Sequence, residues 1–128
     1  NADFKAYLDG VAYGKILGDS FNGYMKSFLY SMACGALVYL AILSFKCFKL
    51  TVLKIIGIVI SIGTFVYFGF FHCVANAFYF AMSISFDYRM ITYFLVNIFG
   101  NFVGALILNF IILGILALLK NKKYKEVL

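Results

Sequence analysis

Within the apolar stretches of this chain, a single histidine has the side chain that is best suited to chemistry. His72 is the only histidine, and it stands in a long stretch that contains no Asp, Glu, Lys or Arg. Because an imidazole titrates close to neutral pH, it can exchange a proton or attract an anion in an apolar environment. The alternative is a buried histidine that bonds a backbone carbonyl and only supports packing. Both interpretations of His72 stay open at this point.

Several asparagines accompany the histidine in the apolar stretches. Asn76 follows His72 by one helical turn if this segment is a helix. Asn97 and Asn109 lie in the last apolar stretch, where an amide most often joins two helices by a hydrogen bond. We therefore expect packing roles for Asn76, Asn97 and Asn109.

Asn101 stands within a pair of glycines that favours close helix packing. Gly100 and Gly104 have the GxxxG spacing, which lets the backbone of another helix approach closely. An amide at this crossing can serve packing or a polar pathway. The role of Asn101 therefore stays open between the two.

The other reactive residues form no catalytic or metal-binding pattern. The three cysteines, Cys34, Cys47 and Cys73, have no CxxC or zinc spacing, and we expect free thiols. No acidic residue lies within an apolar stretch, and no HExxH or Gly-rich phosphate loop occurs. The sequence therefore predicts no enzyme, and no cofactor or metal is expected.

The composition indicates a membrane protein. Hydrophobic residues make up 65% of the 128 residues and charged residues 12%, whereas a soluble domain has about 45–50% and about 25%. A soluble domain of this size could not bury so much apolar surface, and a disordered chain would be far more polar. Both classes are excluded, and an all-α polytopic membrane protein is predicted.

Three blocks without charged residues predict three transmembrane spans within a membrane repeat over residues 26–119. The predicted spans are 26–45, 55–86 and 90–119. A membrane-crossing helix needs about 20 apolar residues. Strands are disfavoured because a barrel strand needs only about 10 residues.

The middle span is too long for one straight helix. A helix over residues 55–86 would measure about 48 Å, against a hydrocarbon core of about 30 Å. Gly69 lies shortly before His72 and marks a point where the helix can end. We therefore predict two helical pieces, 55–71 and 73–86, with a break near 69–73.

The distribution of cations predicts the orientation in the membrane. The loop after the first span and the tail over residues 120–128 are rich in lysine, whereas the opposite side has as many acidic as basic residues. The positive-inside rule places the lysine-rich side, and with it the C-terminus, in the cytoplasm. The net charge of +6 is then a topology signal, and no nucleic-acid partner is expected.

Residues 1–25 then lie on the extracytoplasmic side. Four apolar residues have helical spacing and predict a short interfacial helix, although a plain connecting segment fits equally well: Phe4, Tyr7, Leu8 and Val11. Because this outer end does not begin with Met, we expect further residues upstream.

Three segments resemble motifs of the formate/nitrite transporter family. Residues 69–78, GFFHCVANAF, are similar to the family's fifth-helix signature GFEHSxANMF. Residues 95–104, LVNIFGNFVG, look like its sixth-helix LGNxxGG segment, and residues 28–38, FLYSMACGALV, look like its fourth-helix FLxGILCNWLV pattern.

The resemblance implies an architecture and a function. Family protomers have six spans in two inverted three-span repeats, assemble as pentamers and move small monovalent anions such as formate, nitrite or hydrosulfide, together with protons. This chain would correspond to the second repeat, half of a protomer, in a bacterial inner membrane. The implied pathway residues are His72 and Asn101 at the pore centre, Phe65 and Val38 at one constriction, Ala75 at the other, and Lys15 in the outer vestibule.

Departures from the family motifs support a competing interpretation. The Glu before the family's histidine is Phe71 here, and the fourth-helix Asn-Trp pair is Gly35-Ala36. The first repeat has no counterpart in these residues. The alternative is therefore an incomplete or degenerate half-channel that acts as a structural membrane subunit or has no transport activity.

Overall fold

The described part of the chain is built of α-helices. A computed structural model describes residues 2–83 and 87–125, with side chains described up to Lys120. It contains no strand within these residues, which confirms the all-α prediction. The helices are α1 (Ala2–Gly14), α2 (Phe21–Cys47), α3 (Thr51–Tyr67), α4 (Cys73–Met82) and α5 (Tyr88–Lys125).

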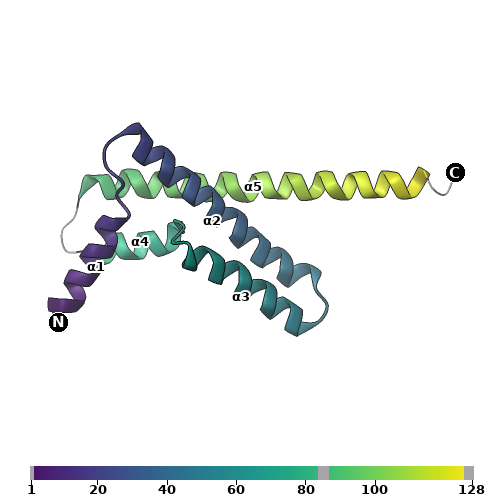
Figure 1. Ribbon diagram of the computed structural model, residues 1–128, viewed down its shortest axis with the longest axis horizontal. Coiled ribbons are helices and arrows are strands. Elements are labelled where there is room, and N and C mark those ends of the chain that lie inside the picture. The colour runs from purple at the N-terminus through teal and green to yellow at the C-terminus, as the bar shows by residue number, and fades with distance from the viewer. Residues whose placement is uncertain (1, 84–86, 126–128) are drawn as a thin grey trace.

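Two long helices cross, and the other three pack on them. α2 lies across α5, and α3 returns alongside the second half of α2 (Figure 1). α4 runs beside the first part of α5 and also contacts α1. The second half of α5 extends beyond the other helices (Figure 1). The centre of the molecule is therefore the region where α3 ends, α4 begins and α2 crosses α5.

Glycines allow the close crossing of α2 and α5. A side chain at Gly35 of α2 would overlap the backbone carbonyl of Asn101, and one at Gly104 of α5 would overlap the carbonyl of Met32. A side chain at Gly100 would meet the Ser31 Cβ at 2.6 Å. Both glycines of the GxxxG spacing therefore lie at this crossing, where backbone touches backbone.

The middle hydrophobic block forms two helices because α3 ends at a glycine cap. Gly69 has a φ of +65°, a conformation that costs a glycine little. Its N–H donates to the Val66 carbonyl at 3.1 Å, and the Phe70 N–H donates to the Phe65 carbonyl at 2.9 Å. This pair of bonds is the Schellman motif. α4 begins after His72, so the break carries the histidine.

The observed helices extend past the charged residues that bounded the predicted spans. α2 begins at Phe21, where the Ser20 hydroxyl caps it by accepting from the Gly23 N–H at 3.2 Å. α3 begins at Thr51, and α5 continues through Lys125. Lysine is a good helix former and can extend its charged end away from apolar surroundings, so it does not end a helix. Parts of the predicted segments, residues 1, 84–86 and 126–128, lie outside the described residues.

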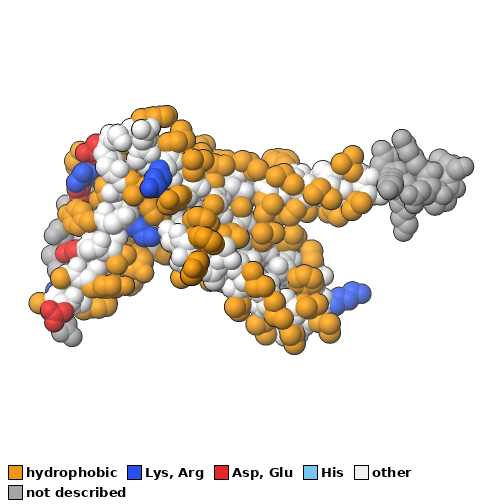
Figure 2. All heavy atoms as spheres, in the orientation of Figure 1, with side chains coloured by type: hydrophobic (Ala, Val, Ile, Leu, Met, Phe, Trp, Pro, Cys, Tyr) orange, Lys and Arg blue, Asp and Glu red, His pale blue; other side chains and the backbone are white. Residues whose placement is uncertain are grey.

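The surface is dominated by apolar side chains, as a lipid environment requires. Figure 2 shows hydrophobic side chains over much of the visible face; the visible acidic groups lie at the end that carries α1, whereas basic groups lie both toward that end and at the far end where α2 and α3 connect. Two helices are long and apolar enough to cross a membrane, namely α2 with 27 residues and the 33 residues Tyr88–Lys120 of α5. α3 and α4 are shorter apolar helices. Such exposure would make a soluble protein aggregate, and it supports the membrane assignment.

The segment at the N-terminus forms a helix, α1, over about half of residues 1–25. Leu8 and Ala12 of α1 are buried, and α1 packs against α4. Phe4 and Tyr7 remain exposed. The predicted apolar stripe is therefore divided between packing and the surface.

An ion pair and a tyrosine fix the connection between α1 and α2 to the start of α5. Arg89 binds Asp87 at 2.6 Å and Asp19 at 3.4 Å. Hydrogen bonds from the Arg89 guanidinium hold the pKa of Asp87 below its ordinary value. The Tyr93 hydroxyl donates to the Gly18 carbonyl at 2.6 Å. These contacts tie the connection between α1 and α2 to the start of α5.

Candidate functional site

His72 caps the helix that follows it. Its Nδ1 accepts a hydrogen bond from the Ala75 N–H at 3.3 Å, and its ring stacks on Phe65 of α3 with 5.4 Å between centroids. Because Nδ1 serves as the acceptor, the neutral imidazole carries its proton on Nε2. The histidine is therefore held from both sides of the break, with Nε2 as its remaining donor.

Asn101 binds the backbone on both sides of His72. Its Nδ2 donates to the Phe71 carbonyl at 2.8 Å, and its Oδ1 accepts from the Cys73 N–H at 3.3 Å. The same Nδ2 donates to the Ser31 carbonyl of α2 at 2.9 Å. One amide thus joins the break, α2 and α5. Its geometry is that of a positioning residue, since both amide hydrogens and the oxygen have backbone partners.

Two grooves meet at His72. A groove of about 360 Å³ lies between α2 and α3, and its lining residues are Val38, Ala41, Ile42, Phe45, Ile58, Ile62, Phe65 and His72. A second groove of about 350 Å³ lies between α2, α4 and α5, and His72, Val38 and Asn101 also line it. The structure therefore brings four of the predicted pathway residues together, while Ala75 lies outside both linings on an exposed turn of α4.

Lys15 reaches the break from the connection that follows α1. Its Nζ lies 4.7 Å from the centroid of the Phe71 ring, a cation–π contact. Phe71 is buried, and Tyr30 of α2 meets it edge-on at 5.6 Å. Burial of the ammonium lowers the pKa of Lys15. A cation therefore lies directly beside the residue that precedes His72.

The two departures from the family motifs have structural consequences. Phe71 fills its position with an apolar ring that packs on Tyr30. At Gly35 any side chain would overlap the Asn101 backbone. The glycine therefore allows the close approach of α2 and α5, and an asparagine at this position would need a larger distance between the two helices.

Sequence reasoning missed a buried set of hydroxyl groups. Ser27 and Ser31 are fully buried on α2, and the oxygen of each lies 2.8 Å from the Oδ1 of Asn97. Tyr39 donates to the Asn109 Oδ1 at 2.6 Å. These bonds confirm the helix-joining roles predicted for Asn97 and Asn109. The signal for the serines was their spacing of four, which places both on one face of a helix.

The cysteines are free thiols, as their spacing predicts. Cys34 is buried, Cys47 is exposed and Cys73 is half-buried. Within residues 2–83 and 87–120, no three His, Cys, Asp or Glu side chains lie close enough to hold a metal ion. The site therefore consists of an imidazole, amides, one cation and aromatic rings.

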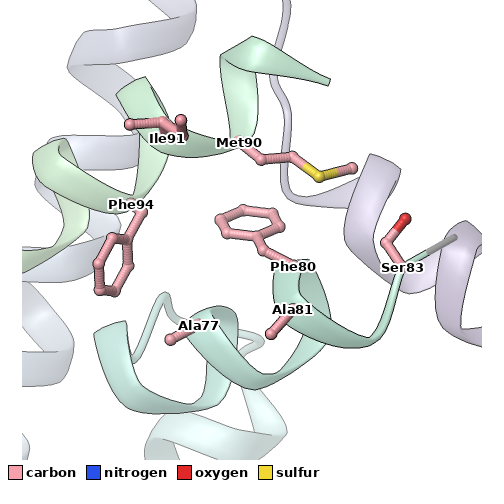
Figure 3. Close-up of a pocket in the computed structure, with 7 residues that line it drawn as sticks. All are labelled: Ala77, Phe80, Ala81, Ser83, Met90, Ile91 and Phe94. Atoms are coloured by element: carbon pink, nitrogen blue, oxygen red, sulfur yellow. The ribbon is translucent and has the colours of Figure 1, made fainter. Parts of the chain in front are cut away.

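A further hollow lies away from His72. It has a volume of about 250 Å³ and lies between α4 and α5 near the end of α4 (Figure 3). The side chains around it are apolar apart from one hydroxyl, and they are Ala77, Phe80, Ala81, Ser83, Met90, Ile91 and Phe94. None of the described residues that line it is titratable.

Comparison with protein-family models gives a match to a known family. A family model described as formate/nitrite transporter matches residues 2–114, which is most of the chain. Searches of curated proteins and of solved structures found no match. The matched range contains all five helices except the last part of α5.

Proposed function

Because the chain belongs to the formate/nitrite transporter family, we propose that it supplies the His72-bearing half of a pore. The substrates are small monovalent anions of the formate, nitrite and hydrosulfide class, and their transport is linked to protons through His72. The family is one of membrane anion transporters and not of enzymes. The observation that carries the proposal is the imidazole at a helix break, where the two grooves meet.

Charge and desolvation suggest how an anion would pass. The ammonium of Lys15 attracts the anion toward the break. In the apolar groove between Val38 and Phe65 the anion loses water, which raises the pKa of its conjugate acid. A proton taken up from the medium passes through His72 to the anion, which leaves the imidazole neutral, and the neutral acid then crosses the apolar constriction. Ala75 borders the pathway on the other side of the histidine.

Partners complete the proposed pore. A second three-span repeat faces this one, and the full-length protomers form a homo-pentamer. The protein resides in a bacterial inner membrane with its C-terminus in the cytoplasm. These partners follow from the family architecture, and the second half of α5, which extends beyond the other helices (Figure 1) and carries exposed apolar side chains, leaves surface for them.

The alternative is a structural half-channel without transport. Phe71 and Gly35 favour it, because each replaces a polar family residue beside the pathway with an apolar or closely packed one. In this alternative the Lys15 cation only supports packing on the Phe71 ring. Uptake by the complete pore, with both three-span repeats present, decides between the two.

Uptake of labelled formate, nitrite and hydrosulfide into liposomes that contain the chain together with its second three-span repeat tests the proposal. His72→Asn keeps a good helix cap but cannot exchange a proton, whereas His72→Ala loses both properties. We expect both variants to lose the pH dependence of uptake. The control is Phe78→Leu on the exposed surface of α4, which should keep it.

The outcomes separate the hypotheses. Wild-type liposomes that take up none of the three anions favour the structural alternative. Uptake by His72→Asn with an unchanged pH profile refutes the proton-sharing role. If uptake is lost in His72→Ala but not in His72→Asn, the role of the histidine is to cap the helix.

A further inference from the structure

Four polar residues form a buried group one helical turn from His72, here called the serine–asparagine cluster. Its members are Ser27, Ser31, Asn76 and Asn97, and none is more than 1% exposed. The Ser27 hydroxyl donates to the Asn97 Oδ1 at 2.8 Å, and the Ser31 oxygen lies 2.8 Å from the same atom. The orientation of the Asn97 amide is therefore set by α2, with its Nδ2 turned away from the serines.

Two donors of this cluster have no acceptor. Among the described residues, neither the Nδ2 of Asn97 nor the Nδ2 of Asn76 has a hydrogen-bond partner, and both atoms are buried. A buried amide without a partner loses the free energy of its hydration. We therefore expect such a buried nitrogen either to have an acceptor nearby or to exchange places with the oxygen of its own amide, whose orientation follows from the hydrogen bonds it can make.

The register of α4 against α5 places the two asparagines at the same level. At the start of α4, the Cys73 N–H donates to the Asn101 side chain of α5. Near the end of α4, Phe80 belongs to the same buried hydrophobic cluster as Tyr93 of α5. Asn76 lies about one turn from Cys73 and from Phe80, and Asn97 lies one turn from Tyr93 and from Asn101. Because the two helices are connected antiparallel neighbours, the two asparagines stand at matching positions along the helices, between these contacts.

We infer that Asn97 donates through its Nδ2 to the Oδ1 of Asn76. A half-turn of the Asn76 amide about its last side-chain bond exchanges oxygen and nitrogen within the same outline. The oxygen then takes the buried place and accepts from Asn97. The serine hydroxyls, Asn97 and Asn76 become one hydrogen-bonded chain that joins α2, α5 and α4.

This amide pair makes Asn76 and Asn97 positioning residues for His72. α4 begins directly after His72, and the ring caps the first turn of that helix. A bond that fixes α4 along α5 one turn away also fixes the imidazole between the two grooves. This role rests on the proposed transport function, whereas the amide pair itself does not.

Side-chain NMR of the full chain, labelled with ¹⁵N at asparagine and held in lipid nanodiscs, tests the bond directly. We expect Asn76→Leu to move the Asn97 side-chain protons upfield and to speed their exchange with solvent. Asn76→Asp keeps an acceptor and should leave the protons in their bonded position. Asn109→Leu removes a helix-joining amide elsewhere on α5 and is the matched control. An Asn97 signal that ignores Asn76→Leu, or responds equally to Asn109→Leu, overturns the inference.

Anion uptake tests the positioning role. Loss of one interhelical bond predicts a fall of about 3- to 15-fold for Asn76→Leu and for Asn97→Leu, and the double variant should fall little further. A merely structural amide would reduce the amount of folded protein and leave the pH profile of uptake unchanged, whereas a displaced His72 shifts that profile. An unshifted profile at normal folding overturns the positioning role. If the wild-type chain takes up no anion, the proposed function and the positioning role fail together, and the NMR result still decides the amide pair.

Discussion

Replacement of Asn101 should destabilise the centre of the molecule more than any other single amide. Asn101→Leu keeps the approximate size of the side chain but removes bonds to the Phe71 carbonyl, the Ser31 carbonyl and the Cys73 N–H. A hydrogen bond between helices in a membrane contributes about 0.6 kcal/mol on average and up to about 1.7 kcal/mol. The loss of three bonds predicts a cost of about 2 to 5 kcal/mol.

The matched control is Asn109→Leu on the same helix. Among the described residues Asn109 has one hydrogen-bond partner, the Tyr39 hydroxyl at 2.6 Å, so the loss of the Asn109 amide should cost about 0.6 to 1.7 kcal/mol. The assay is reversible unfolding of the full chain in mixed micelles, followed by helical circular dichroism. Uptake measured on the same variants reports whether His72 is still in place.

The pair of variants can refute the reasoning. If Asn101→Leu and Asn109→Leu lower the unfolding free energy equally, the three backbone bonds of Asn101 are not additive contributors to stability. If Asn101→Leu lowers stability as expected but keeps uptake and its pH profile, Asn101 does not position the histidine.

Three further predictions concern the packing of α2 on α5, the attraction of the anion by Lys15, and the stability of the fold in acid. Gly104→Ala places a methyl group against the Met32 carbonyl and should lower the free energy of unfolding by about 1–3 kcal/mol. In the control Gly114→Ala the methyl group meets no atom, and the free energy of unfolding should rise by up to about 1 kcal/mol. Equal effects of the two variants on stability would contradict the close crossing of α2 and α5. Lys15→Met should raise the KM of anion uptake about two- to tenfold and weaken its dependence on ionic strength, with Lys15→Arg as the control. Because Arg89 lowers the pKa of Asp87, their contact stabilises the fold above the ordinary aspartate value of 3.8 and is lost as the pH falls through the lowered value. Thermal melts from pH 6 to pH 2 should show this loss, and Asp87→Asn should show less of it.

Local features of the chain were sufficient to predict the break in the middle block. The length of the uncharged stretch required an interruption, and Gly69 is a residue that tolerates a positive φ. His72 follows it by three residues, so the histidine at the break was predictable. The boundaries were less accurate because charged residues served as markers, although α2 and α5 continue past them.

The roles of the polar residues were predictable only in part. Asn97 and Asn109 were expected to join helices, and they do. The serines that bind Asn97 were not expected, because a serine on a hydrophobic helix most often bonds its own backbone. From the sequence, Gly35 was interpreted only as a position where the family's asparagine is lost. Its contact with Asn101 depends on how closely α2 and α5 approach.

The sequence by itself determined the class of the protein, its hydrophobic blocks, the break and the histidine, because apolar length and local caps act within a few residues. The tertiary structure decided which groups meet. Asn101 and Ser31 are 70 residues apart, as are Ser27 and Asn97, and their contacts depend on the angle and register at which α2 crosses α5. That geometry comes from backbone contact at Gly35, Gly100 and Gly104, which no local pattern specifies, since the partner surface lies on another helix.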